Sequence, residues 1–300
     1  MDSKQTLINK YIEDLRAELA GVDMAIVVDA VSDANEYFYN ELREIGKSNP
    51  ELNDGEVFNK AQSNFGSPKE FAQYYLDTEE TVEKALHSRL RTVEYRGGFL
   101  RIFSDPQAYT SFFFTILYFI TGVFYFAWAL TGMAVSISFG ILIFGIPVAL
   151  FFFGSYRVFS HVESRFVEAV LKERMPRRRI FERFEGNITS IFMQYLKDGY
   201  TWRCWGYMML RFPLGLFSFL AVIIPLGLAV DLILTPILNR EEQVINGILQ
   251  LLPVESGIWI LPITIPFSFL FVVATLYISK MIGRLQARFA KAMLVPGREL

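Results

Sequence analysis

The sequence contains few of the residues that build most catalytic and metal-binding sites. It has one cysteine, Cys204, and two histidines, His87 and His161, which are far apart in the chain. A single cysteine excludes an internal disulfide and a thiolate metal cluster. Glycine-rich phosphate-binding loops and the HExxH motif are also absent. The sequence therefore predicts no catalytic residue, cofactor or metal site, and we expect His161 and nearby Glu163 to be solvated.

Charge is absent from residues 106–156, a run of 51 residues without Asp, Glu, Lys, Arg or His. At about 1.5 Å per residue, a bilayer core of roughly 30 Å takes about 20 helical residues, so this run is long enough for two crossings. We expect a helical hairpin whose turn falls in Thr131–Gly140, where small and polar residues are densest. Hydrophobic residues make up 52% of the chain and the mean hydropathy is +0.31, which also favours an integral membrane protein.

An apolar leader is missing from the first 20 residues, which are charged, so we expect no cleaved signal peptide. Residues 1–86 hold 8 Lys/Arg and 18 Asp/Glu, a net charge of −10, whereas residues 87–300 hold 21 and 13, a net charge of +8. This difference predicts two domains of opposite sign. We place an acidic, cytoplasmic domain at residues 1–96 and a membrane domain at residues 97–300.

The acidic domain carries four amphipathic helical patterns, with apolar residues at spacings of three and four. The second pattern places Asp29 and Asp33 on its polar face. The clearest local signal is Ser67-Pro68-Lys69-Glu70, which combines an N-cap serine, a proline at the first helical position and a capping-box glutamate. We therefore expect a small helical domain whose fourth helix begins there.

Two segments of this domain carry a family resemblance. They are Leu7-x3-Tyr11-x3-Leu15-x3-Leu19 and Glu56-x4-Ala61-x3-Phe65-Gly66-Ser67-Pro68-Lys69-Glu70-Phe71-Ala72. Roughly residues 5–76 resemble the HAAS domain, a small helical signalling domain of prokaryotic membrane proteins. The resemblance implies a signalling role, although Gly66-Ser67-Pro68 can equally be a plain connection between two helices.

The membrane half of the sequence repeats itself. A shift of 93 residues aligns Asp105, Leu117, Phe119, Gly122, Phe124 and Phe126 with Asp198, Leu210, Phe212, Gly215, Phe217 and Phe219. A shift of 123 residues aligns Arg165, Phe166, Ala169 and Leu171 with Arg288, Phe289, Ala292 and Leu294. We interpret the membrane domain as two copies of one helical hairpin in the same orientation, with an insertion between the spans of the second copy. The predicted fold is all-α, a four-helix membrane bundle with a small N-terminal helical domain.

The four spans are expected at about residues 109–132, 135–157, 205–230 and 257–279. Lysine and arginine are unevenly divided between the connections: residues 157–211 hold eleven, the tail from Lys280 holds five, and residues 239–256 hold only Arg240. Because cytoplasmic loops carry the excess of Lys and Arg, both termini should be cytoplasmic and the protein should lie in the cytoplasmic (inner) membrane.

A second resemblance lies in the membrane half. It is carried by Asp198-Gly199-Tyr200-Thr201-Trp202-Arg203 followed by Tyr207-x3-Arg211-Phe212-Pro213-Leu214-Gly215-x3-Phe219. Roughly residues 98–295 resemble a sensor-domain membrane family of bacteria and archaea that also occurs ahead of histidine kinases. The first copy departs from the pattern, with Tyr109 in place of Trp202 and Ile120 in place of Pro213. No kinase core follows Leu294, so we expect any output to leave through the N-terminal domain or a partner.

Basic residues cluster in the connection between the two copies. The candidate contacts for anionic lipid headgroups or for a protein partner are Arg174, Arg177, Arg178, Arg179, Arg183 and Arg211. Juxtamembrane arginines are attracted to anionic lipid, but they also set membrane orientation, and the acidic domain is another possible partner. We hypothesise that the acidic helices rest against residues 174–183 in one state and are released in another.

Two charges fall within a predicted span, Arg211 and Asp231. They stand near its two ends, so the simpler interpretation is that Arg211 reaches the cytoplasmic interface and Asp231 the outer one. The alternative is that Arg211 faces the bundle and holds an anionic group.

Two further features are structural candidates. Gly122 and Gly215 occupy equivalent places in the two copies, so we expect both at helix crossings, where lipid-embedded helices need small residues. Val244, Ile248, Leu249 and Leu252 line one face of an external amphipathic segment, which is either a sensing element or a cap over the bundle.

The sequence as a whole predicts a membrane sensor without catalytic activity. It would relay a membrane or envelope signal through its cytoplasmic helical domain to a protein partner such as a regulator or kinase. The alternative is an accessory subunit that stabilises a larger membrane complex or transporter. We expect no direct binding of nucleic acid.

Overall fold

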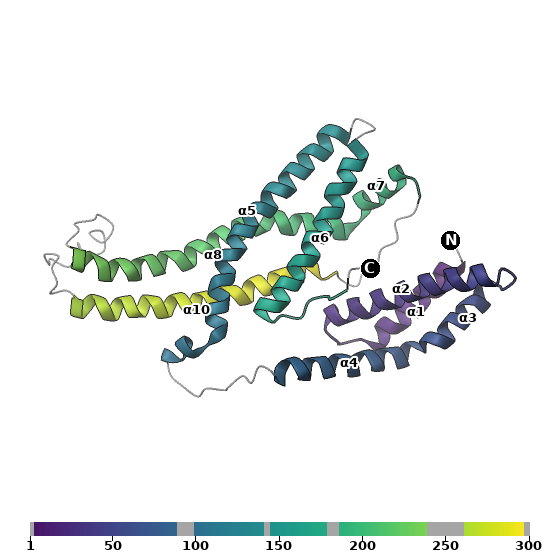
Figure 1. Ribbon diagram of the computed structural model, residues 1–300, viewed down its shortest axis with the longest axis horizontal. Helices are drawn as coiled ribbons and strands as arrows, with labels where there is room; N and C mark the ends of the chain where they lie inside the picture. The colour runs from purple at the N-terminus through teal and green to yellow at the C-terminus, as the bar shows by residue number, and fades with distance from the viewer. Residues whose placement is uncertain (1–2, 89–98, 141–144, 179–185, 239–260, 297–300) are drawn as a thin grey trace.

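The computed structural model describes residues 3–88, 99–140, 145–178, 186–238 and 261–296, and every regular element within these residues is helical (Figure 1). The elements are α1 (Ser3–Glu18), α2 (Met24–Ser48), α3 (Asp54–Phe65), α4 (Pro68–Ser88), η1 (Phe99–Ser104), α5 (Pro106–Gly140), α6 (Gly145–Leu171), α7 (Ile188–Lys197), α8 (Gly199–Leu238) and α10 (Leu261–Leu294). The predicted all-α class is therefore confirmed.

Helices α1 to α4 form a small domain with a core of its own. The fully buried side chains at its centre include Leu15, Leu19, Phe38 and Val57. The predicted capping box is present: the Ser67 backbone N–H donates to Glu70 Oε2 at 2.9 Å, and the Glu70 N–H donates to Ser67 Oγ at 3.3 Å. The four helical patterns of the sequence are thus four helices.

Three of the described helices are long and apolar enough to cross a membrane: Pro106–Ser138, Gly199–Leu234 and Leu261–Leu294. They support an integral membrane protein, and they overlap three of the four predicted spans. The remaining predicted span, 135–157, includes residues 141–144, which lie outside the described residues. The external segment with Val244, Ile248, Leu249 and Leu252 also lies outside them.

The predicted turn within Thr131–Gly140 is wrong, because α5 stays helical to Gly140. Small and polar residues mark turns in water, where the solvent can satisfy a broken backbone. In lipid, a helix keeps every backbone N–H and C=O paired, so such residues do not end it. The next described helix, α6, begins at Gly145.

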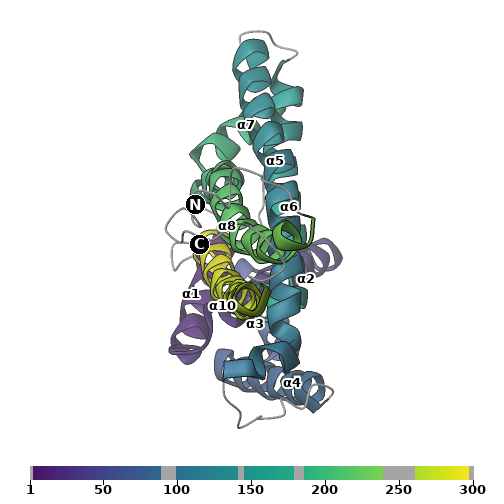
Figure 2. The ribbon, with the colours of Figure 1, turned by 90° about the vertical axis from the view of Figure 1, so that its left-hand side faces the viewer.

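The long helices do not all run side by side. Helices α8 and α10 lie along each other, while α5 crosses them (Figures 1 and 2). Helix α6 packs against α5 and also contacts α8 and α10. Helices α5, α6, α8 and α10 enclose an interior with buried tyrosines, including Tyr118, Tyr156 and Tyr207. The N-terminal domain lies at the end of the molecule where α6 and α10 finish.

Candidate functional site

The N-terminal domain contacts the membrane domain at a tight turn that follows α6. Lys172 has a φ of 59°, in the left-handed region that commonly ends a helix, and its N–H donates to the Glu168 carbonyl at 3.1 Å. Residues 172–178 then fold back beside the end of α6. We call these residues the connector turn.

Asp29 of α2 is enclosed by the connector turn. Its carboxylate accepts hydrogen bonds from the backbone N–H groups of Arg177 at 2.9 Å and Arg178 at 2.8 Å, and from Arg174 Nη2 at 2.9 Å. Successive backbone N–H groups that converge in this way form an anion-binding concavity. The side chain of Asp29 is 1% exposed, so three donors replace the water that its charge has lost.

Ion pairs extend the contact on both sides of Asp29. Glu79 of α4 pairs with Arg174 Nε at 2.8 Å and with Arg177 Nη1 at 3.1 Å. Asp33 pairs with Arg178 Nε at 3.0 Å. The face of α2 on which the sequence pattern places Asp29 and Asp33 therefore contacts the connector turn.

Lys291 of α10, in the second copy of the repeated hairpin, also contacts the N-terminal domain. Its Nζ lies 2.7 Å from Asp23 Oδ2 and 2.8 Å from Glu173 Oε1. One lysine thus joins the start of α2, the connector turn and the last span. The contact involves three segments that are distant in sequence.

Apolar side chains complete the interface. Met24 and Val28 of α2 pack against a buried cluster of the membrane domain that includes Val167, Met175 and Leu294. Burial also raises the pKa of Asp33, and the neighbouring Arg178 opposes that shift. The domain is therefore held by apolar packing together with a network of partly buried charges, in which one unpaired charge would be costly.

The predicted basic cluster is only partly described. Arg174, Arg177 and Arg178 contact acidic groups, while Arg179 and Arg183 lie outside the described residues. Sequence reasoning named the acidic domain as one possible partner but did not identify Asp23, Asp29 or Glu79. The available signal was the excess of acidic residues in residues 1–86. It gives the sign of the domain's charge but does not indicate which residues make the contact.

Arg211 lies in the interior of the membrane domain. Its side chain is 1% exposed and pairs with Glu163 of α6, which is 3% exposed. Arg211 Nη1 also donates to Tyr207 Oη at 2.8 Å, and Nη2 donates to Thr121 Oγ1 at 2.7 Å. Its guanidinium carbon lies 4.2 Å from the centre of the Tyr118 ring.

Two expectations are therefore wrong. Arg211 does not extend to the interface, because an opposite charge, two hydroxyls and aromatic faces satisfy it inside the bundle. Glu163 is not solvated, because α6 turns it inward toward α8. Sequence reasoning missed their pairing because Glu163 follows the predicted second span, in a stretch that reads as a polar tail. Asp231 is half-buried on α8.

Gly122 and Gly215 lie opposite each other where α5 crosses α8. A Cβ on Gly122 would lie 3.2 Å from the Arg211 carbonyl oxygen and 3.4 Å from Phe212 Cα. A Cβ on Gly215 would lie 3.1 Å from Phe119 Cα. The two backbones approach too closely for a larger side chain at either place.

Other contacts occur in pairs separated by the same shifts of 93 and 123 residues. Asp105 pairs with Lys280 of α10, and Asp198 pairs with Arg157 of α6, with 2.5 Å between Asp198 Oδ2 and Arg157 Nη2. Each aspartate stands just before the long helix of one copy and contacts the other copy. The two ion pairs are thus exchanged between the halves of the membrane domain.

Two further pairs follow the same shifts. Tyr109 Oη donates to the Phe103 carbonyl at 3.0 Å, and Trp202 Nε1 donates to the Leu196 carbonyl at 2.8 Å. The ring centres of Phe114 and Phe166 are 5.7 Å apart with an interplanar angle of 21°, and those of Tyr207 and Phe289 are 5.5 Å apart at 22°. Tyr109 and Trp202 occupy equivalent positions but are different residue types, and each donates to the carbonyl of the residue six positions before it.

A protein-family model described as "Putative sensor" matches residues 114–294, which is more than half of the chain. No curated protein and no solved structure matches the chain significantly. The matched segment begins in α5 and ends with α10, so it contains Arg211, Glu163 and the connector turn.

Proposed function

Since this match shows that the chain belongs to the Putative sensor family, we propose that it is a membrane sensor without catalytic activity. It detects a membrane or envelope condition in its bundle and relays it through the N-terminal domain, which we assign to the HAAS type. The observation that carries this proposal is the enclosure of Asp29 by the connector turn.

A continuous set of contacts supports a relay between the bundle and the domain. Arg211 on α8 holds Glu163 on α6, and α6 continues to the connector turn that holds Asp29. A displacement of α6 against α8 would move the connector turn, because packed helices move as rigid elements. The N-terminal domain would then be held in one arrangement of the bundle and released in the other, which is the two-state element that a relay requires.

We also propose that the membrane domain is a duplicated hairpin with four spans and a pseudo-two-fold axis along the membrane normal. The reciprocal contact of Gly122 and Gly215 supports this relation, as do the exchanged ion pairs of Asp105 and Asp198. In this arrangement both termini are cytoplasmic and the protein lies in the inner membrane, as the distribution of Lys and Arg favours.

A second function is favoured by the mixed character of the interface. Met24 and Val28 add apolar contacts to the ion pairs, and a permanently docked domain would use such contacts. This arrangement suits an accessory subunit of a larger membrane complex or transporter, whose N-terminal domain stays in place.

Copurification from native membranes distinguishes the two functions. We expect the wild-type protein to bring with it a regulator or kinase, in an amount that changes when Arg174→Gln and Arg177→Gln weaken the docking contact. Lys197→Gln with Arg203→Gln is the control, because it removes the same charge from exposed residues outside that contact. A stoichiometric set of membrane subunits, unchanged by the docking variant, would favour the accessory function.

A further inference from the structure

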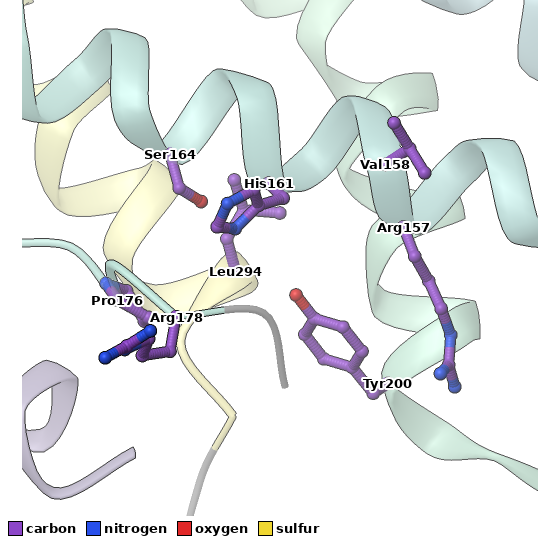
Figure 3. A pocket seen from close by; sticks show the side chains of 8 residues that line it. All are labelled: Arg157, Val158, His161, Ser164, Pro176, Arg178, Tyr200 and Leu294. Atoms are coloured by element: carbon purple, nitrogen blue, oxygen red, sulfur yellow. The ribbon is translucent and has the colours of Figure 1, made fainter. Parts of the chain in front are cut away.

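A cavity of about 120 Å³ lies between the connector turn and the membrane helices. It is lined by Arg157, Val158, His161 and Ser164 of α6, Pro176 and Arg178 of the connector turn, Tyr200 of α8 and Leu294 of α10 (Figure 3). A space of roughly 10–15 Å³ holds one water, so this cavity has room for a group of several non-hydrogen atoms.

The lining has the chemistry of an anion site. Two arginines, a histidine, a serine and a tyrosine line the cavity, and none of the lining residues that the structure describes is acidic. In Figure 3 the Tyr200 hydroxyl points toward the side where His161 lies, Arg178 and Arg157 lie at opposite ends of the group, and the Arg157 side chain extends away from the other labelled residues. Guanidinium groups suit phosphate oxygens because their N–H donors form a planar fork.

The two arginines are held in place by neighbours outside the cavity. Arg157 pairs with Asp198 at 2.5 Å and donates from Nε to Thr201 Oγ1 at 2.9 Å. Arg178 contacts Asp33 through Nε, and its side chain is 62% exposed. A guanidinium has five N–H donors, so one contact through Nε leaves Arg178 able to bind a second anion.

The position of the cavity adds a second argument. Arg157 lies at the end of the proposed second span, and Tyr200 lies in the first turn of α8. The nearby Trp202 indole and the equivalent Tyr109 phenol are of the kind that gathers at membrane interfaces. In the proposed four-span arrangement, the cavity would therefore lie at the depth where the phosphates of lipid headgroups occur.

We propose that this cavity binds a phosphate group, carried either by an anionic phospholipid or by a soluble phosphate compound. Arg178 and His161 provide N–H donors, Arg157 adds positive charge at the far end, and the Tyr200 hydroxyl, which also contacts Cys204, is a further polar neighbour of the bound group. This inference goes beyond the sensor function, because the site would bind phosphate whether or not the N-terminal domain is ever released. It also gives Arg178 two competing anions, Asp33 and the ligand.

The experiment measures ligand binding by the full-length protein in nanodiscs. In phosphatidylcholine nanodiscs, inorganic phosphate is titrated against chloride at equal ionic strength, and the thermal unfolding midpoint is followed. In a second arm, the midpoint is compared between nanodiscs with and without phosphatidylglycerol. Stabilisation in the first arm that the cavity variants lose identifies a soluble phosphate source, because phosphate also stabilises folded proteins without binding to a site. Stabilisation in the second arm alone, again lost in the variants, identifies a lipid headgroup.

The variants are His161→Gln with Arg178→Gln, and Tyr200→Phe as a milder change that tests the site if the double variant does not fold. Because the double variant removes charged hydrogen-bond donors to the phosphate group, we expect it to weaken the apparent affinity by about tenfold or more. Arg165→Gln, on the exposed side of α6, should leave the affinity within about twofold. Absence of stabilisation in both arms, or equal affinity in the wild type and both cavity variants, would overturn the proposal.

Discussion

Gly122 of α5 and Gly215 of α8 lie at the same helix crossing. Each glycine is close to residues that lie about one helical turn before the other glycine. Gly122 approaches Arg211 and Phe212, and Gly215 approaches Tyr118 and Phe119. Each of these positions in α5 corresponds to its counterpart in α8 by the same shift of 93 residues. A contact of this kind, in which the same surface is used on both sides, is what a two-fold relation produces.

The crossing predicts a specific sensitivity to side-chain size. Gly122→Leu or Gly215→Leu should separate α5 from α8 and destabilise the protein by about 1–3 kcal/mol, which is typical of overpacking. Thermal unfolding in detergent measures the effect. Gly154→Leu is the control, because a Cβ there has no atom within 4 Å. Equal stability of all three variants would show that the repeated glycines have no shared packing role.

The Arg211–Glu163 pair predicts strong coupling between its two members. Arg211→Met or Glu163→Gln alone leaves one buried charge unpaired, and each should cost about 3–5 kcal/mol. The double variant should cost clearly less than the sum of the two, because it removes both charges. Thermal unfolding of the four proteins forms a double-mutant cycle. Strictly additive losses would mean that the two side chains do not stabilise each other.

The distribution of basic residues predicts the membrane topology. Reporters placed at Asp2 and after Leu300 should be cytoplasmic, and one inserted near Asn246 should be external, because four spans return the chain to the side where it began. Enzymatic reporters active on only one side of the membrane give the answer. If Asn246 and Leu300 are on the same side, the four-span arrangement fails.

Neutralising the connector turn should expose the N-terminal domain. In Arg174→Gln with Arg177→Gln, Glu79 loses both of its arginine partners and Asp29 loses Arg174. Protease cleavage between the two domains should therefore become faster by about tenfold. Cleavage is followed by electrophoresis at low and high salt. Lys197→Gln with Arg203→Gln should behave as the wild type. Unchanged cleavage in the docking variant at low salt, where screening is weakest, would refute electrostatic docking.

The sequence was most informative where local patterns determine structure. The spacing of apolar residues and the Ser67 to Glu70 capping box predicted the helices of the N-terminal domain, and the charge-free run predicted membrane helices. The turn within Thr131–Gly140 was wrong because rules for turns in water do not transfer to lipid. The opposite charges of the two domains predicted that they attract each other, but not which residues are in contact.

The details of the site depend on tertiary structure that leaves little local trace. Backbone N–H groups of Arg177 and Arg178 hold Asp29, and such donors have no sequence signature. Glu163 and Arg211 come from helices that are separated by the connector turn and α7. The repeat shifts were the strongest long-range signal, because they aligned residues whose contacts also correspond, such as Tyr109 with Trp202.

In the relay that we propose, the N-terminal domain docks on the connector turn and can be released from it. Spin labels at Glu44→Cys and Ala169→Cys, both at exposed positions, would report the separation of α2 and α6 in membranes, with buried Cys204 replaced by serine. Double electron–electron resonance should give one narrow distance distribution when Arg174 and Arg177 are unchanged. Arg174→Gln with Arg177→Gln should shift that distribution to longer, broader distances. A broad distribution in the protein with both arginines, or an unchanged narrow distribution in the Arg174→Gln, Arg177→Gln variant, would show that these arginines do not hold the N-terminal domain in place.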